Sequence, residues 1–483
     1  MPVTTSSPDK TPLRRLHWYA LLAYTLILIA SRLPFISAGY GMHIDTWAVS
    51  KAAKHIATTG QYSFSRSPGY PVHEILCALI WKGGPAALNG LSAAFSVAGF
   101  IIFALILRHY GCRQYALGSL AAFFAPVIYL NSISSKDYVL SLTFVLAALL
   151  LVLRRRTLLA GIALGLAAGC RSTYCLMALP LCLAMLSRDS LKTSWRQMLL
   201  LCLTGAATAL LCFAPVLFTY GKNAFIFHTL SFEEMIFGNY LVLVSRFTRR
   251  IWGDFGALAI AVAVLTVPYF KFSNPSLRQS PGPWSFASWL SVIGIYCPLY
   301  YLVPWDPAYL IPTIPFVILL LARFLDQRLF IAVCLCIILS SFAGIGKPYG
   351  LKAGPIIQDH RGRLQQLAFL EQSIVTIEAE AQKHAKTVVI LGPDYRPMSD
   401  LFASRTKNKS IQYVFYLPEQ QTRASIAAGI QVLYMPSVLE TTMYYQKIDL
   451  RKIGARPVWP ALDKKGRAPM TSEVEKATRP LWE

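Results

Sequence analysis

The first apolar run of the chain and the stretch after it decide the fold: residues 16–36 read LHWYALLAYTLILIASRLPFI, and residues 39–62 read GYGMHIDTWAVSKAAKHIATTGQY. The first stretch is long enough to cross a membrane and ends without a small-residue cleavage pattern, which predicts a retained signal anchor. In the second, apolar side chains from Val49 to Ile56 recur at helical spacing beside a charged face. This pattern predicts an amphipathic helix on the membrane surface that ends at Gly60.

The composition extends this interpretation to the whole chain, since 55% of the 483 residues are hydrophobic and only 14% are charged. Such values are typical of a polytopic membrane protein and unlike those of a soluble enzyme. We therefore predict an α-helical membrane protein with about eleven transmembrane helices. The predicted spans are residues 16–36, 91–107, 115–130, 138–153, 158–170, 174–186, 198–218, 255–270, 286–301, 309–322 and 329–342.

The charged residues predict the topology. A formal net charge of +23 would suggest nucleic-acid binding in a soluble protein, but here many Lys and Arg residues lie in short loops between apolar runs. Basic groups such as Arg14, Arg108, Arg154 and Arg323 fall on alternate loops, which by the positive-inside rule predicts a cytoplasmic N-terminus. We expect a bacterial inner (plasma) membrane protein that contacts anionic lipid and has no nucleic-acid partner.

The tail, residues 347–483, has a different composition, with 20 Lys plus Arg and 13 Asp plus Glu. Strand signals in TVVILG, IQYVFYL and QVLYMP alternate with helix signals in SDLFAS, QQTRASIAAG and ETTMYYQ, which predicts a small α/β domain. We divide the chain into a transmembrane domain, residues 1–346, with an external amphipathic loop, residues 37–90, and a periplasmic or extracellular α/β domain, residues 347–483. The last twenty residues are predicted to be loosely ordered.

Acidic residues are scarce before residue 347, where only ten occur, and seven of these fall in or beside loops predicted to be external. A carboxylate at a membrane face suggests a function. Asp45 and Asp137 each stand at the start of a predicted helix, so an N-cap is the simpler role for either residue alone. The seven are Asp45, Glu74, Asp137, Glu233, Glu234, Asp254 and Asp306.

Several short motifs over residues 1–345 occur in a recognisable order. An aspartate after the first span (Asp45) precedes an amphipathic helix, a proline-containing turn (SPGYPVHE), a short external Lys-Asp pair at residues 136 and 137, and YLIPTIPF near the last spans. This order resembles the GT-C superfamily of polyprenyl-phosphate-sugar-dependent glycosyltransferases, such as protein O-mannosyltransferases and the aminoarabinose transferases of lipid A. The resemblance implies that Asp45 is the catalytic base and that Asp137 is the second acidic residue. In place of the family's phosphate-binding lysine in the turn, this sequence offers Arg66 or His73.

Transfer from a lipid phosphate needs a base for the acceptor hydroxyl and cations for the departing phosphate. Asp45 is suited to the first role if burial or a neighbour raises its pKa, and a single displacement would invert the anomeric centre. The external cations that could hold the phosphate are Arg66, Lys136 and Arg171, with His73 as a weaker candidate. Residues expected to contact the substrates are Tyr70, Glu74, Glu233, Glu234, Trp305, Asp306 and Tyr309.

The same residues are compatible with a second function. A multi-pass transporter or lipid-linked saccharide flippase is the main alternative, although it would favour charges near the membrane midplane. Arg171 could instead snorkel to lipid headgroups, and Glu233 and Glu234 could lie in a solvated loop. No cofactor is predicted, while a divalent cation on carboxylate oxygens is an alternative to Arg and Lys. The expected partners are a polyprenyl-phosphate sugar donor, a glycan, lipid or protein acceptor, and membrane lipids.

Overall fold

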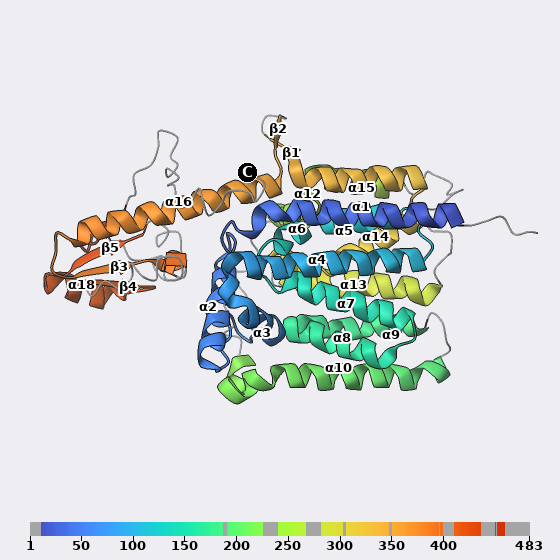
Figure 1. Ribbon diagram of the computed structural model, residues 1–483, viewed down its shortest axis with the longest axis horizontal. Helices are drawn as coiled ribbons and strands as arrows, with labels where there is room; N and C mark the ends of the chain where they lie inside the picture. The colour runs from blue at the N-terminus through green and yellow to red at the C-terminus, as the bar shows by residue number, and fades with distance from the viewer. Residues whose placement is uncertain are drawn as a thin grey trace, which may run out of the picture.

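The computed structural model describes residues 11–186, 191–225, 240–266, 282–302, 306–346, 350–395, 397–398, 410–435, 450 and 452–458. Most of these residues are helical, and the long helices run side by side in one bundle (Figure 1). The bundle consists of α1 (Thr11–Ile36), α4 (Gly84–His109), α5 (Tyr115–Phe124), α6 (Pro126–Ser132), α7 (Tyr138–Leu153), α8 (Thr157–Cys170), α9 (Ala178–Leu186), α10 (Leu191–Tyr220), α12 (Tyr240–Thr266), α13 (Pro283–Leu302), α14 (Thr313–Phe324) and α15 (Gln327–Phe342).

Each predicted apolar run overlaps one or two of these helices, and α7 has the predicted bounds. Within the described residues, four helical segments are long and apolar enough to cross a membrane, or five if the bent pair α5–α6 is one span. Five other apolar helices are shorter. These helices indicate a multi-pass membrane protein, while the number of eleven spans stays a prediction.

The predicted span at residues 115–130 is broken in the structure. The axes of α5 and α6 differ by 71°, and the backbone of Ala125 between them is extended because Pro126 follows it. Arg32 of α1 is fully buried beside the break, where it donates to the carbonyl oxygen of Phe123 at 2.6 Å and to Ser132 Oγ at 3.2 Å. Arg32 thus supplies a donor to a carbonyl near the end of α5, whose last turn has no helical partners.

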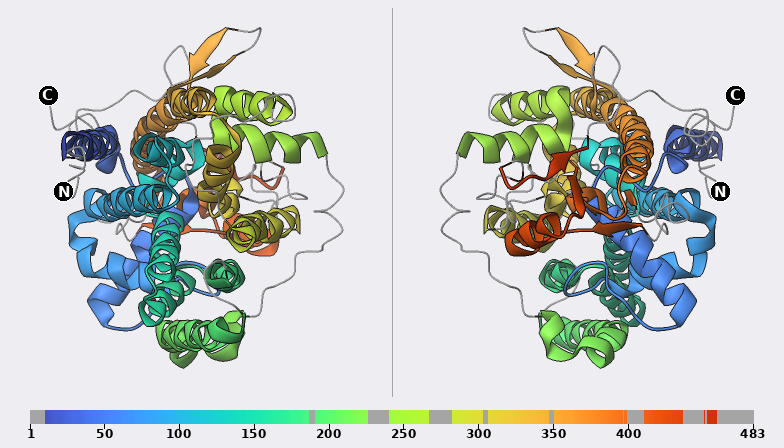
Figure 2. Two further views of the ribbon diagram at one scale, coloured as in Figure 1. Left: turned by 90° about the vertical axis from the view of Figure 1, so that its right-hand side faces the viewer. Right: turned by 90° about the vertical axis from the view of Figure 1, so that its left-hand side faces the viewer.

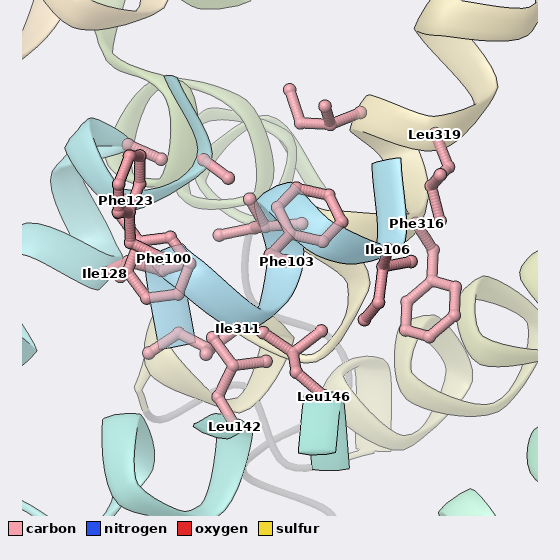
Figure 3. Close-up of a cluster of buried hydrophobic side chains, with 14 of the residues drawn as sticks. Phe100, Phe103, Ile106, Phe123, Ile128, Leu142, Leu146, Ile311, Phe316 and Leu319 are labelled. Atoms are coloured by element: carbon pink, nitrogen blue, oxygen red, sulfur yellow. The ribbon is translucent and has the colours of Figure 1, made fainter. Parts of the chain in front are cut away.

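The hydrophobic core lies where α4, α5, α7 and α14 meet. Figure 3 shows Phe100 and Phe103 of α4 near Phe123 of α5, Leu142 of α7 and Phe316 of α14, all of which are buried. The sequence of α7 is apolar on every face, which explains why the bundle surrounds this helix. This packing fixes the start of α7, where polar residues of the candidate site begin.

Two helices, α2 (Ile44–Thr59) and α3 (Pro71–Ile80), lie at one end of the bundle (Figure 1). The predicted amphipathic character of α2 is confirmed, because Val49 and Ala53 are buried while Lys54 is exposed. Gly60 ends the helix as predicted, with a left-handed φ of 71° and its N–H donating to the carbonyl oxygen of Ile56.

The N-cap role predicted for Asp45 is wrong, because α2 begins two residues earlier than that role requires. His43 occupies the N-cap position, and its Nδ1 accepts from the backbone N–H of Asp45 at 3.3 Å. Asp45 therefore lies in the first helical turn, where an acidic residue also interacts favourably with the helix dipole. Its carboxylate bonds to side chains of other segments.

The chain after α15 leaves the bundle. β1 (Ala343–Ile345) and β2 (Leu351–Ala353) pair antiparallel and project as a hairpin (Figure 2). The helix α16 (Pro355–Ala381) then leads to a parallel sheet with the order β4-β3-β5-β6. Its strands are β3 (Thr387–Ile390), β4 (Ile411–Val414), β5 (Gln431–Tyr434) and β6 (Arg456–Pro457), with α18 (Glu419–Ala427) between β4 and β5.

Three of these strands and α18 coincide with predicted strand and helix signals, whereas α16 was not predicted. The helix signals SDLFAS and ETTMYYQ and the last twenty residues lie outside the described residues. The division of the chain into two domains, and the external location of the second, stay predictions.

Candidate active site

Two aspartates and two arginines form a chain of ion pairs at the end of the bundle where α2 lies. Arg66 Nη1 is 2.5 Å from Asp45 Oδ2, and Arg66 Nη2 is 2.8 Å from Asp137 Oδ1. Asp137 Oδ2 accepts from Arg171 Nη1 at 2.7 Å. The side chain of Asp137 is fully buried, whereas that of Asp45 is 17% exposed. The chain of charges therefore runs from the protein interior towards the surface.

Each member of this chain comes from a different segment. Asp45 is in the first turn of α2, Arg66 is in the loop between α2 and α3, and Arg171 follows the last residue of α8 with an extended backbone. Asp137 occupies the N-cap position of α7 but makes no side-chain capping bond. Because four segments converge, the site forms only in the folded protein.

Neighbouring charges keep both aspartates ionised. Burial alone would raise the pKa of Asp137, but Arg171 and Arg66 outweigh it and hold that pKa below its usual value. For Asp45, burial is outweighed by a hydrogen bond from His43 and by the charge of Arg66, so this pKa is lowered as well. Both groups are therefore anions at neutral pH.

His43 can bond to Asp45 in two ways. Its Nδ1 is 3.1 Å from Asp45 Oδ2 and 3.3 Å from the backbone nitrogen of Asp45. A ring nitrogen that carries a proton donates to the carboxylate, whereas one without a proton accepts from the backbone N–H. The presence or absence of a proton on Nδ1 thus decides whether His43 holds the carboxylate or caps α2.

Three tyrosine rings surround the two guanidinium groups. The guanidinium carbon of Arg171 lies 4.0 Å from the ring centroid of Tyr138 and 4.8 Å from that of Tyr309. The corresponding distance from Arg66 to Tyr70 is 4.6 Å. Contacts of this kind stabilise a cation that has been removed from water. Tyr70 and Tyr309, both predicted to contact substrate, contact the arginines here.

Lys136 and Asp306 form a second ion pair beside this chain. Lys136 Nζ is 3.3 Å from Asp306 Oδ2, to which the hydroxyl of Tyr138 also donates at 3.3 Å. Asp306 Oδ1 accepts from the backbone N–H of Ala308 at 2.9 Å and so caps the short helix η4 (Pro307–Leu310). Burial opposes ionisation of Asp306, but Lys136 and the Ala308 N–H hold its pKa below the usual value.

Glu74 organises the turn that carries Arg66. This carboxylate is fully buried, and its Oε1 accepts from both the backbone N–H and the hydroxyl of Ser65 at 2.6 Å. Its Oε2 accepts from the hydroxyl of Tyr62 and from the backbone N–H of Tyr70 at 3.0 Å. These four bonds tie together the two sides of the turn. His73, one residue earlier, is also fully buried, with its Nε2 3.5 Å from Cys77 Sγ.

A cavity of about 680 Å³ opens beside the second ion pair. His43, Thr46, Lys136 and Asp306 line it on one side. Its other walls come from α6, α12, the β1–β2 hairpin and the first turns of α16. The charged residues in those walls are Arg249, Arg250, Asp254, Lys352, Asp359 and Arg363. With Lys136 and Asp306 included, five formal positive charges thus face three negative ones, so the cavity favours an anion.

The predicted site residues fall into three groups. Eight meet around the ion pairs: Asp45, Arg66, Tyr70, Lys136, Asp137, Arg171, Asp306 and Tyr309. His73 and Glu74 lie behind them, fully buried. Glu233, Glu234 and Trp305 lie outside the described residues.

Some residues of the site and cavity were not predicted. His43 and Tyr138 are direct or near neighbours of Asp45 and Asp137, so their place in the sequence was an available signal. Arg249, Lys352 and Arg363 reach the cavity through the tertiary fold, which no local pattern indicates.

A metal ion is the alternative to cationic side chains that the sequence leaves open. Among the residues that the structure describes, no three His, Cys, Asp or Glu side chains gather as metal ligands. The guanidinium of Arg66 occupies the space between Asp45 and Asp137.

No protein-family model matches this chain, and no curated protein matches its sequence. Among solved structures, the chain is similar to the crystal structure of ArnT from Cupriavidus metallidurans bound to undecaprenyl phosphate, with a TM-score of 0.45 and 16% sequence identity. The similarity covers 74% of this chain and 64% of ArnT, so the chain spans less than two thirds of that protein.

Proposed function

We propose that the protein is an integral membrane glycosyltransferase that moves a sugar from a polyprenyl-phosphate donor to an acceptor at the external membrane face. The observation that supports this most is the chain Asp45–Arg66–Asp137–Arg171, which adjoins Lys136 in the wall of the cavity. It combines a partly exposed carboxylate, which can accept a proton once Arg66 is drawn away from it, with guanidinium groups suited to bind a phosphate.

In the proposed step, an acceptor hydroxyl attacks the anomeric carbon and its proton passes to the Asp45 carboxylate. The bond between the anomeric carbon and the phosphate oxygen breaks, and polyprenyl phosphate leaves with the bonding electron pair. Arg66, Arg171 and Lys136 stabilise the charge that develops on this phosphate. A single displacement of this kind inverts the anomeric centre, and no general acid is required because the phosphate is a good leaving group.

Arg66 links donor binding to the basicity of Asp45. A carboxylate with a lowered pKa accepts a proton poorly, so Asp45 is a weak base while Arg66 holds it. An incoming phosphate is itself an anion and competes for Arg66. We infer that the donor draws Arg66 away from Asp45, which then becomes basic only when a donor is bound.

The remaining predicted residues divide between binding and support. Tyr70 and Tyr309 hold the arginines and can stack on a sugar, while Asp306 orients Lys136. Glu74 already accepts four hydrogen bonds, so we propose that it shapes the Arg66 turn and does not bind substrate. The buried His73 supports the same region from behind.

The cavity is the proposed entrance for the acceptor. Arg250 and Lys352 lie in its far wall, so an acceptor that carries negative charge would fit it best, whether glycan, lipid or protein. The lipid chain of the donor would lie along the apolar helices of the bundle. We further propose a bacterial inner membrane location with a cytoplasmic N-terminus, which puts the site and the tail on the external side.

The test is donor breakdown by the purified protein in vesicles that contain a set of polyprenyl-phosphate sugars. We expect free polyprenyl phosphate to accumulate together with a glycosylated acceptor. A flippase would instead move the intact lipid-linked sugar across the bilayer and release no polyprenyl phosphate, and that result would overturn the proposal.

A further inference from the structure

The first turns of α16 pack against the end of the bundle that carries the candidate site. His360 lies edge-on to Phe35 of α1, with ring centroids 5.0 Å apart. Three residues further along α16, Arg363 is only 2% exposed, and its Nε bonds to Asp359 Oδ2 at 2.7 Å. Asp359 and Arg363 also line the cavity. The segment that leads to the C-terminal sheet is therefore part of the cavity wall.

Arg363 reaches past this wall to the loop that carries two site residues. Its Nη1 donates to the backbone carbonyl oxygen of Ile133 at 2.9 Å. Ile133 directly follows α6, whose last carbonyl groups have no helical partner. A buried guanidinium that donates to such a carbonyl forms a strong, charge-assisted hydrogen bond.

The loop from Ile133 to Asp137 (the Asp137 loop) is short and held at several points. Ser135 Oγ donates to the carbonyl oxygen of Thr46 in α2 at 3.3 Å, and Ser134 Oγ donates to that of Leu130 at 2.9 Å. Of these anchors, only Arg363 comes from beyond residue 350. The position of Lys136 and Asp137 thus depends on a contact with α16.

We propose that Arg363 is a positioning residue, through which α16 fixes the Asp137 loop and with it Lys136 and Asp137. Arg363 acts through the backbone of Ile133, to which its Nη1 donates. Its effect on transfer rests on the proposed function, whereas its effect on the loop does not. The C-terminal segment accordingly takes part in building the site.

The first test needs no activity. Hydrogen exchange of residues 131–138 is compared between the wild-type protein and Arg363→Met, Asp359→Asn and Arg361→Met. Arg361 is exposed on the same helix and serves as the matched control. We expect faster exchange in Arg363→Met, a smaller increase in Asp359→Asn and none in Arg361→Met. Unchanged exchange in a folded Arg363→Met protein would overturn the proposal, and Asp359→Asn decides the question in the same way if Arg363→Met does not fold.

The second test uses transfer. A misplacement of about 1 Å can cost about 100-fold in rate, so we expect Arg363→Met to lower transfer by about 10-fold to 100-fold and Arg363→Lys to restore part of it. In a Lys136→Met background the same change should cost less than it does in the wild-type protein, because coupled residues are not additive and only the effect through Asp137 is left. Fully additive losses would show that Arg363 acts on stability alone and would contradict the proposal. An inactive wild-type protein would refute the proposed function, while the exchange result would still decide the role of Arg363.

Discussion

The turn from Tyr62 to Glu74 and the Asp137 loop each contain a fully buried carboxylate, but different kinds of donor stabilise the two groups. Glu74 accepts four hydrogen bonds from neutral donors of its own turn. Asp137 accepts from Arg66 and Arg171, which come from two other segments. The first carboxylate therefore holds local structure, whereas the second holds an assembly of charges that an anionic ligand can enter.

This difference indicates that Glu74 supports the structure, whereas Asp137 belongs to the charged assembly that can bind a substrate. A phosphate cannot compete with Glu74 for the Ser65 and Tyr70 N–H groups, because these donors belong to the buried turn itself. It can compete for the guanidinium groups around Asp137, since these are cations, and Lys136, the residue before Asp137, lines the cavity. Substitutions in the charged assembly should therefore cost more transfer activity than substitutions in the turn.

Of the two buried carboxylates, Asp137 should matter more than Glu74 for both stability and transfer. Asp137→Asn leaves the buried guanidinium of Arg171 and the partly buried one of Arg66 without this counterion, a loss that costs about 3–5 kcal/mol when a buried pair is broken. We expect a clear drop in thermal stability and a loss of transfer of about 100-fold or more. A protein with wild-type stability and activity would show that the ion pairs around Asp137 are unimportant.

Arg66→Gln removes the link between Asp45 and Asp137 and should lower transfer by about 10²-fold to 10³-fold, which is typical when a group that stabilises developing charge is lost. The pKa of Asp45 should also move up towards its usual value, because the charge of Arg66 lowers it. The low-pH limb of residual activity, below which Asp45 is protonated, should therefore move to higher pH. A low-pH limb that does not move would contradict the effect of Arg66 on the pKa of Asp45.

Glu74→Gln should act mainly on stability, by about 1–3 kcal/mol, because the new amide presents a donor to the buried N–H groups around it. We expect transfer to fall only several-fold, as the turn that carries Arg66 loosens. Tyr62→Phe, which removes one of the four donors, is the milder companion. Loss of activity as large as that of Asp137→Asn, without loss of stability, would mean that Glu74 itself contacts substrate.

His43→Ala should have the smallest effect. A hydrogen bond from His43 contributes to the lowered pKa of Asp45, so its removal should move the low-pH limb of activity upward by less than about one pH unit. The rate at neutral pH should change little, because Arg66 still holds Asp45 ionised. A downward shift of the limb would contradict the assigned interaction.

Local patterns in the sequence predicted those parts of the fold that depend on neighbouring residues. The bounds of α7 follow from its uniformly apolar sequence, and the end of α2 follows from Gly60. The bend at Ala125 escaped prediction because hydropathy continues through Pro126, although proline disfavours a helical residue before it. Helix α16 was not predicted, because polar and apolar residues are mixed along its sequence. The elements of the tail were predicted around its strand signals, which this stretch lacks.

The sequence predicted several residues of the candidate site, but it did not predict which of them contact each other. Counting carboxylates in external loops pointed to Asp45 and Asp137, and both lie at the ion pairs. Arg66, offered as a substitute for a lysine absent from the turn, proved to be the bridge between them. The role of Glu74 and the reach of Arg363 depend on contacts across the fold, which sequence spacing does not encode.

The measurement that tests the central claim most directly compares Asp45→Asn with the wild type for both donor binding and donor breakdown. Asp326→Asn, which alters a helix cap of α15, is the control. If Asp45 is the base, the variant should bind polyprenyl phosphate about as well as the wild type but release it from the donor about 10²-fold to 10⁴-fold more slowly. Release at the wild-type rate by Asp45→Asn would contradict the assignment.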